Sequence, residues 1–320
     1  MQIPQNTLNW LLEEENPGVR YLALKDLVED VDPAELESAR VAAYQSGPIA
    51  EILGAMNRHG FWEKQGAGYT PKYKSGVWSL ISLAMLGARV DHDPALAKAC
   101  KYYIDHAFCE DGGLTYNGKP HGYITCLQGN MCAALTLLGV QDERLDKAFA
   151  LMSARIDGSA EKYYSYAYAP GFSCSANNKK ECAWGAVKTL WAYSTLPSEK
   201  RSAHASAIQR GVDFLFSVDP VTADYPTWNG QPTSSNWWKF GFPVFYITDM
   251  LQAVDALAGL GYGDDPLLKN AVDRILSMQD EDGRWKLGYN YGAKTWMQAG
   301  VLNKPNKWVT YRVLSLLTKL

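Results

Sequence analysis

Two kinds of apolar pattern alternate along the chain. In residues 93–108 and 142–155, apolar side chains recur every three or four positions with charged residues between them, which predicts amphipathic helices with one buried face. In residues 77–86 and 182–193, nearly every position is apolar, and a helix without a polar face must be buried on all sides. The alternation predicts outer helices that shield inner ones. Further amphipathic helices are expected in 16–29, 33–43, 199–217 and 265–279, and further apolar ones in 126–138, 245–260 and 308–317.

A loop rich in glycine and aromatic residues precedes each apolar segment. Repetition of such a unit is typical of helical-repeat architectures, and no Pro/Ser-rich linker or charge run interrupts it. Together with the helix expected in 16–29, the repeats make six helix pairs, enough to close a ring. We therefore expect residues 1–320 to form a single all-α domain. The loop-plus-helix units span 60–87, 112–139, 171–197, 225–261 and 283–320.

Composition excludes several classes of protein. A net charge of -3 with interspersed signs provides no basic stripe for nucleic acid. No apolar run reaches the roughly 18 residues of a membrane span, and residues 1–5 lack the features of a secretory signal. Six cysteines in 320 residues are too sparse for a disulfide scaffold, so we expect reduced thiols in a cytoplasmic protein. The oligomeric state stays open, with a homo-oligomer as one alternative.

Three short motifs resemble those of known families. Residues 279–285, Gln-Asp-Glu-Asp-Gly-Arg-Trp, fit the Q-x-x-x-G-x-W repeat of squalene–hopene cyclases at every fixed position. Residues 121–126 resemble the His-Gly-Gly-Tyr-Thr-Phe-Cys run of protein prenyltransferase β subunits with one glycine missing, and residues 245–248 resemble a later Phe-Tyr-His-Thr there. The resemblance extends over about the last three quarters of the chain. It implies an α/α toroid, with concentric inner and outer helices around an apolar central cavity.

The catalytic motifs of these families are altered or missing in this sequence. The prenyltransferase subunits hold zinc with an Asp and a Cys two residues apart and with the His of Phe-Tyr-His-Thr. Here Lys180 stands two residues before Cys182, and Ile247 stands at the histidine position. The Asp-x-Asp-Asp motif of the squalene cyclases does not occur, and neither does a Gly-rich phosphate loop. We therefore expect no inherited zinc site and no cofactor.

Asp249, Tyr246 and His121 are candidates for catalysis. Tyr246 and Asp249 are three residues apart, so they would share a face of the expected helix. A buried Asp in such an apolar segment destabilises the fold unless it is paired or functional. If Asp249 faces a cavity, it could be a general acid. The alternative is a structural Asp paired with Lys188 or Arg312. The resemblance places His121 where prenyltransferases contact the substrate diphosphate, and a structural histidine is the alternative.

Three cysteines are further candidates. Cys174 and Cys182 flank a polar loop that contains Lys179 and Lys180 and enters an apolar helix. A helix N-terminus and nearby lysines lower the pKa of a thiol, which favours nucleophilic, acid–base or metal-ligand roles. Cys126 begins the preceding apolar helix, so the three thiols could converge, or all three could be small packing residues. A cysteine pair also occurs in the toroid-shaped linalool dehydratase–isomerase, whose local sequence differs.

Aromatic residues and lysines concentrate in the loops and helix starts. In a toroid these positions lie at one mouth, where ring faces stabilise cations by roughly 0.5–2 kcal/mol or stack on sugars, and where lysines would form a positive rim. The alternatives are core packing for the rings and solvated loop charge for the lysines. Four tyrosines of one loop are Tyr163, Tyr164, Tyr166 and Tyr168. The expected substrate-binding residues are Tyr73, Trp78, Tyr123, Cys126, Trp184, Trp238 and Tyr311.

Three hypotheses for function follow. The first is a terpene cyclase-like lyase or isomerase, which uses an aromatic cavity for acid-initiated isomerisation, dehydration or cyclisation of a small hydrophobic, isoprenoid-like substrate. The second is a carbohydrate-active toroid, a lyase or hydrolase in which Trp and Tyr stack on sugar rings. The third is a non-catalytic binding protein. A deep closed pocket favours the first, a long open groove the second, and a plugged centre the third.

Overall fold

The computed structural model describes residues 3–162, 170–231 and 234–320. The loop tyrosines Tyr163, Tyr164, Tyr166 and Tyr168 lie outside these ranges. Every regular element among the described residues is a helix, and backbone pairing between extended segments is limited to isolated bridges. The predicted all-α class is confirmed. In the described part of the chain, no helix combines the length and the apolar character that crossing a bilayer requires.

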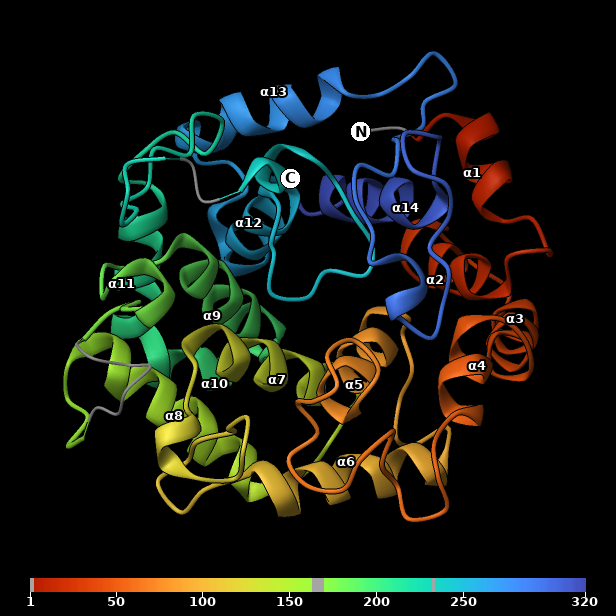
Figure 1. Ribbon diagram of the computed structural model, residues 1–320. Coiled ribbons are helices and arrows are strands. Elements are labelled where there is room, and N and C mark those ends of the chain that lie inside the picture. The colour runs from red at the N-terminus through yellow and green to blue at the C-terminus, as the bar shows by residue number, and fades with distance from the viewer. Residues whose placement is uncertain (1–2, 163–169, 232–233) are drawn as a thin grey trace.

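The amphipathic helices lie on the outside of the molecule (Figure 1). Three of them begin at the aspartates that the sequence places before a helix, because these carboxylates accept the free backbone N–H groups of the first turn. Two short outer helices, α1 and α4, were not predicted. The outer helices are α1 (Gln5–Leu11), α3 (Pro33–Gln45), α4 (Pro48–Gly54), α6 (Pro94–Ala107), α8 (Glu143–Asp157), α11 (Ala205–Leu215) and α13 (Lys269–Ser277).

The apolar helices lie inside this outer set in Figure 1. Each packs against an outer helix, and α5, α7, α9, α12, α14 and α2 contact one another in that order. Trp78, Cys126, Trp184 and Thr310 lie on α5, α7, α9 and α14, as predicted. Helix α2, expected among the amphipathic helices, lies in this inner set instead. The inner helices are α2 (Pro17–Leu27), α5 (Gly76–Met85), α7 (Thr125–Leu137), α9 (Ala183–Thr195), α12 (Met250–Leu257) and α14 (Lys307–Leu317).

The prediction of a helix over 245–260 is wrong in its first part. Helix α12 begins at Met250, because the Asp249 carboxylate accepts the backbone N–H of Gln252 at 2.9 Å and caps the helix there. The preceding residues are not helical, and this segment crosses the centre of the molecule in Figure 1. Tyr246 is therefore not on an inner helix, and it shares no helix face with Asp249.

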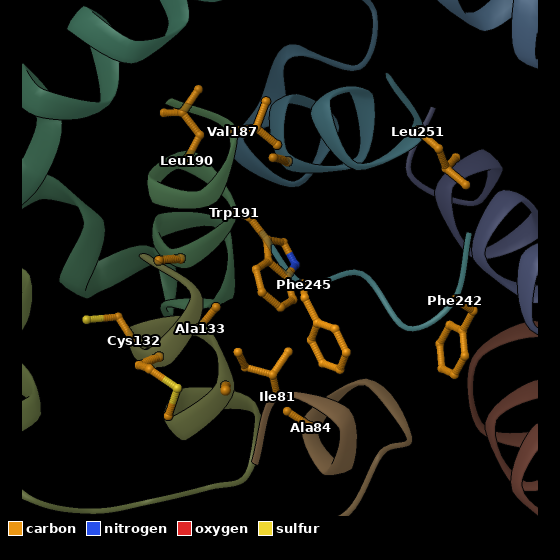
Figure 2. Packing of buried hydrophobic residues seen from close by; sticks show 14 of the residues in the cluster. Ile81, Ala84, Cys132, Ala133, Val187, Leu190, Trp191, Phe242, Phe245 and Leu251 are labelled. Atoms are coloured by element: carbon orange, nitrogen blue, oxygen red, sulfur yellow. The ribbon is translucent and has the colours of Figure 1, made fainter. Parts of the chain in front are cut away.

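Aromatic side chains fill the centre of the molecule. Figure 2 shows Phe242 and Phe245 projecting from the crossing segment into the interior. The Phe245 ring lies 4.8 Å from that of Tyr291, 5.3 Å from that of Trp78 and 5.4 Å from that of Tyr73, between ring centroids. The space enclosed by the inner helices is thus packed at its middle and not continuously open.

Candidate functional site

A pocket of about 470 Å³ lies where α7 and α9 begin. Cys126 is the second residue of α7, and Cys182 immediately precedes α9. The N-termini of both helices, which carry partial positive charge, therefore lie beside the pocket. Its walls comprise Tyr69, Lys72, Ile124, Cys126, Cys174, Ser175, Ala176, Asn177, Cys182, Trp184, Thr227, Trp228, Asn229, Gln231 and Tyr246.

A hairpin-like loop brings Cys174 and Cys182 together. Ser173 and Glu181 form an antiparallel bridge, and the backbone N–H of Cys174 donates to the carbonyl of Lys180 at 3.1 Å. Because side chains alternate between the two faces of extended backbone, the residues after Ser173 and after Glu181 project to the same side. Both are free cysteines, and each changes the pKa of the other.

Cys174 is the thiolate of this pair. Hydrogen bonding with Cys182 and with the backbone N–H groups of Ala176 and Asn177 outweighs burial and lowers the pKa of Cys174 to about 6. The same bond and burial raise the pKa of Cys182 well above its usual value. The predicted assistance from lysine is not the cause of the lowered pKa: the Lys180 ammonium instead donates to the Thr227 carbonyl at 2.8 Å.

Cys126 is a neutral thiol in the same pocket. Burial raises the pKa of Cys126 to about 12, and the nearby Cys174 charge adds to that effect while Lys188 opposes it. Across the described residues, no group of three or more His, Cys, Asp and Glu side chains is placed to hold a metal ion. The pocket thus combines a thiolate with two protonated thiols.

Two polar groups of the pocket walls have no partner. The Tyr246 hydroxyl and the Trp184 indole N–H are buried, and neither makes a hydrogen bond of normal geometry. Burial and the neighbouring Tyr69 phenol raise the pKa of Tyr246 well above its usual value. The Lys72 ammonium lies 5.5 Å from the Tyr69 ring centroid and 5.6 Å from that of Tyr246. Buried donors are usually satisfied, so these two are exceptions, and both atoms have almost no solvent-accessible surface.

Asn177 connects the cysteine loop to the opposite wall. Its amide donates to the Pro226 carbonyl at 2.9 Å and accepts the Trp228 backbone N–H at 2.9 Å. Trp228 is 61% exposed and is held at the pocket by these bonds. We did not predict Asn177 as a site residue, because no local pattern relates it to a segment about 50 residues further on.

Asp249 lies outside this pocket. It is fully buried, and its two carboxylate oxygens accept hydrogen bonds from the Arg312 guanidinium at 2.8 and 2.9 Å. The prediction that Asp249 shares a helix face with Tyr246 toward a cavity is wrong. The alternative of a pairing with Arg312 is what the structure has, while the Lys188 ammonium donates to Gln252 at 2.6 Å.

Three other predicted site residues are also absent from the pocket walls. His121 is exposed, and its Nε2 lies 3.0 Å from the Asn117 amide. Tyr123 is buried in the core with the Arg155 guanidinium 4.2 Å from its ring centroid. Trp78 is fully buried behind the wall, where its indole N–H donates to the Tyr69 carbonyl at 2.8 Å.

The remaining predicted residues are dispersed. Tyr73 packs on Tyr291 with ring centroids 4.5 Å apart, and the Trp238 indole donates to the Val221 carbonyl at 2.6 Å. Tyr311 lines a separate cavity of about 790 Å³. The predicted residues that the fold does bring together in the pocket are Cys126, Cys174, Cys182, Trp184 and Tyr246.

No protein-family model and no curated protein matches the chain.

Proposed function

We propose that the chain is an α/α-toroid enzyme that isomerises or dehydrates a small hydrophobic, isoprenoid-like molecule by general acid–base catalysis. One observation carries the proposal: Cys174, whose pKa is lowered to about 6, lines the same pocket of about 470 Å³ as Tyr246 and Trp184, whose buried hydroxyl and indole N–H have no partner. The alternation of outer amphipathic and inner apolar helices supports the toroid assignment. A cytoplasmic setting suits this chemistry, because a disulfide between Cys174 and Cys182 would remove the thiolate.

In the proposed reaction, Cys174 is the base and Tyr246 the acid. The Cys174 thiolate, with its pKa of about 6, takes a proton from a substrate carbon at neutral pH. The Tyr246 hydroxyl donates a proton to a departing hydroxyl group, and water is lost. In an isomerisation, the thiol of Cys174 returns its proton to a different carbon, and the double bond moves. Trp184 donates a hydrogen bond to the same substrate oxygen.

Cyclisation started by protonation of an alkene is less well supported than elimination or double-bond migration. Such a reaction needs a strong acid, whereas the protonated groups of the pocket have raised pKa values. Asp249, the acid expected for that role, is an ion-paired carboxylate. A base-assisted reaction uses the groups that the pocket does contain.

A non-catalytic binding protein is the second candidate. A plugged centre was the feature expected of a binding protein. The packing of Phe245 against Trp78 and Tyr291 at the centre of the molecule therefore favours this candidate. The two candidates differ in one outcome: a binding protein retains an isoprenoid ligand without converting it.

Turnover of prenyl alcohols of increasing length tests the proposal, with products followed by gas chromatography and mass spectrometry. Cys174→Ala and Tyr246→Phe should each lower turnover by about 10²-fold or more, as expected for loss of a general base or acid. The rate should rise with pH up to about pH 6, where Cys174 loses its proton, and then level off.

The control is Cys109→Ala, because Cys109 is a buried cysteine that does not line the pocket. Turnover that survives Cys174→Ala at the wild-type rate would refute the catalytic assignment. Tight binding of a prenyl alcohol without any product would favour the binding protein.

A further inference from the structure

The cavity of about 790 Å³ has no part in the proposed reaction. Part of its wall is apolar and buried, and consists of Trp191, Phe242 and Leu251. Figure 2 shows Trp191 and Phe242 projecting toward the interior from α9 and from the crossing segment. Two polar side chains of the same wall, Gln252 and Arg312, have hydrogen-bond donors that the protein leaves unused. A cavity with apolar walls and a few convergent polar groups is typical of a small-molecule site.

Gln252 has free amide N–H groups at this cavity. The residue is only 4% exposed, and its Oε1 accepts the Lys188 ammonium at 2.6 Å and the Thr248 hydroxyl at 2.7 Å. An ammonium can only donate, so the amide oxygen must face Lys188, and Nε2 is the atom left over. Nε2 has no hydrogen-bond partner among the described residues, and unlike the Tyr246 hydroxyl it retains accessible surface. Because Gln252 lines the cavity, these donors are available to a ligand there.

Arg312 has one free edge of its guanidinium at the same cavity. Its Nη1 donates to the Gly241 carbonyl at 2.6 Å and to the Asp249 carboxylate at 2.9 Å, and its Nη2 donates to the other Asp249 oxygen at 2.8 Å. A guanidinium has five N–H groups, so the Nε–H and one Nη2–H remain. These two lie on one edge and point the same way, which matches the two oxygens of a carboxylate. Nε also retains accessible surface, and Arg312 lines the cavity.

The buried charges beside this wall leave one positive charge without a counter-charge. Asp249 and Arg312 form an ion pair and compensate each other. Lys188 is fully buried, and its ammonium contacts the Gln252 amide and forms no salt bridge with a described residue. A buried charge destabilises a protein unless it is compensated. An anion bound at Gln252 and Arg312 would supply the missing negative charge.

The acidic residues of the cavity already have cationic partners. Asp26 and Asp255 are the two carboxylates that line it. Asp26 lies 3.4 Å from the Lys25 ammonium, and Asp255 lies 2.6 Å from that of Lys319. Neither carboxylate therefore compensates Lys188, and the unused groups of the wall are donors.

We propose that this cavity binds medium-chain monocarboxylates. The carboxylate accepts hydrogen bonds from the free edge of Arg312 and from the Gln252 amide, and the alkyl chain packs against Trp191, Phe242 and Leu251. Hydrogen bonds between charged partners are roughly twice as strong as neutral ones, so an alcohol of the same length is a weaker ligand. The site is separate from the cysteine pocket, and the proposal does not depend on the reaction assigned to that pocket.

Isothermal titration calorimetry of the full chain with octanoate is the first test. The titration is made at about pH 6, because Lys188, with its pKa of about 7, then carries its proton. We expect one octanoate per chain, and affinities for 1-octanol and octylamine that are lower by about 10-fold or more. Octanol lacks the negative charge, and an ammonium cannot accept from the free donors. Absence of octanoate binding, or equal binding of octanol or octylamine, would overturn the proposal.

Gln252→Glu is the decisive variant. A carboxylate at this position can accept the Lys188 ammonium and the Thr248 hydroxyl as the amide does, but it removes the free donors and supplies the counter-charge of Lys188. Octanoate affinity should fall by about 10-fold or more, while thermal melting confirms the fold. Gln209→Glu is the matched control, because it makes the same change at an exposed residue that does not line the cavity. Equal octanoate affinity of the two variants would overturn the role of Gln252.

Two further variants locate the ligand. Lys188→Met should weaken the binding of octanoate but not that of octanol, because it removes the charge and leaves the apolar wall of the cavity. Trp228→Ala changes the cysteine pocket and should leave octanoate affinity unchanged. Wild-type octanoate affinity in Lys188→Met would overturn the role of the buried charge. Loss of octanoate binding in Trp228→Ala would place the ligand in the cysteine pocket and overturn the inference.

Discussion

The Asp249 carboxylate is surrounded by hydrogen-bond donors, including the positively charged guanidinium of Arg312. It is fully buried, and beside the two bonds from Arg312 it accepts the backbone N–H of Gln252 and that of Gly241. The Tyr289 hydroxyl lies 3.4 Å from the same carboxylate. Removing one charge of a buried ion pair strongly lowers the free energy of unfolding, because the other charge stays buried and uncompensated. At the residue scale, the carboxylate therefore holds α12, α14 and the crossing segment together.

Asp249→Asn should consequently destabilise the protein by roughly 3–5 kcal/mol, the usual penalty for leaving one member of a buried pair alone. Urea denaturation followed by circular dichroism measures the change. Asp255→Asn is the matched control, because Asp255 pairs with Lys319 at a partly exposed position (27% and 40% exposed) and should lose less than about 1 kcal/mol. A free energy of unfolding for Asp249→Asn equal to that of the control would contradict the structural role.

At the scale of elements, the contact between α7 and α9 determines where the pocket cysteines lie. Gly129 of α7 faces the backbone of α9 so closely that a Cβ atom there would lie 2.6 Å from the Lys188 carbonyl oxygen. Backbone cannot move aside as a flexible side chain can. Because α7 carries Cys126, and Cys182 and Trp184 stand at the start of α9, the spacing of these two helices sets the width of the pocket at this wall.

Gly129→Ala should therefore lower the free energy of unfolding by about 1–3 kcal/mol, as overpacking does, although alanine is the better helix former. Thermal melting and urea denaturation both report the loss. Gly54→Ala is the control, since a Cβ atom at Gly54, the last residue of α4, meets nothing within 4 Å. That variant should be unchanged or gain up to about 1 kcal/mol. Equal stability of the two variants would show that α7 and α9 can separate without penalty.

At the scale of the whole molecule, two cavities lie toward opposite ends of the inner helices. The starts of α7 and α9 line the cysteine pocket, whereas Thr136 near the end of α7 and Trp191 near the end of α9 line the cavity of about 790 Å³. Between them lies Lys188, a fully buried lysine whose ammonium donates to Gln252. Burial lowers the pKa of Lys188 to about 7, against an opposing effect of Asp249 and Cys126.

Lys188 and Cys174 should make the stability of the fold rise with pH near neutrality. Between about pH 7 and the ordinary lysine value of 10.5, the unfolded chain holds a proton that folded Lys188 has lost. Between about pH 6 and 9, the unfolded chain likewise holds a proton that folded Cys174 has lost. In both cases the unfolded state binds more protons, so the free energy of unfolding rises by up to about 1.4 kcal/mol per pH unit for each group. Above pH 9, Cys126 opposes the rise, because its folded pKa is about 12.

Urea denaturation across this pH range measures the slope. Lys188→Met should flatten the rise of the free energy of unfolding above pH 7. At lower pH, the same variant should be as stable as the wild-type protein or more stable, because it removes a buried charge. Gln252 keeps a partner in this variant, since the Thr248 hydroxyl donates to the same oxygen at 2.7 Å. Cys174→Ala should flatten the lower part of the curve. A wild-type slope in both variants would mean that neither group titrates as its burial and hydrogen bonds imply.

The sequence by itself determined the all-α class, most of the helices and part of the site. Helices form from local spacing of apolar residues and from local caps, so residues 93–108 and 142–155 could be assigned without knowledge of the fold. Cys126 and Cys182 were correctly expected at helix starts, because a helix start is also a local feature. Their convergence with Cys174 in one pocket was one of two alternatives that the sequence left open, and the structure has this one.

Only the tertiary structure decided which chemistry each group can perform. Asp249 is a structural carboxylate because Arg312, 63 residues away, pairs with it, and Trp228 lies at the pocket because Asn177, 51 residues away, binds it. The pKa of Cys174 is lowered because Cys182 and two backbone N–H groups form hydrogen bonds that favour its charged form. Hydrogen-bond partners and burial set the charge of a buried group, and both depend on contacts between segments that no local pattern of residues records.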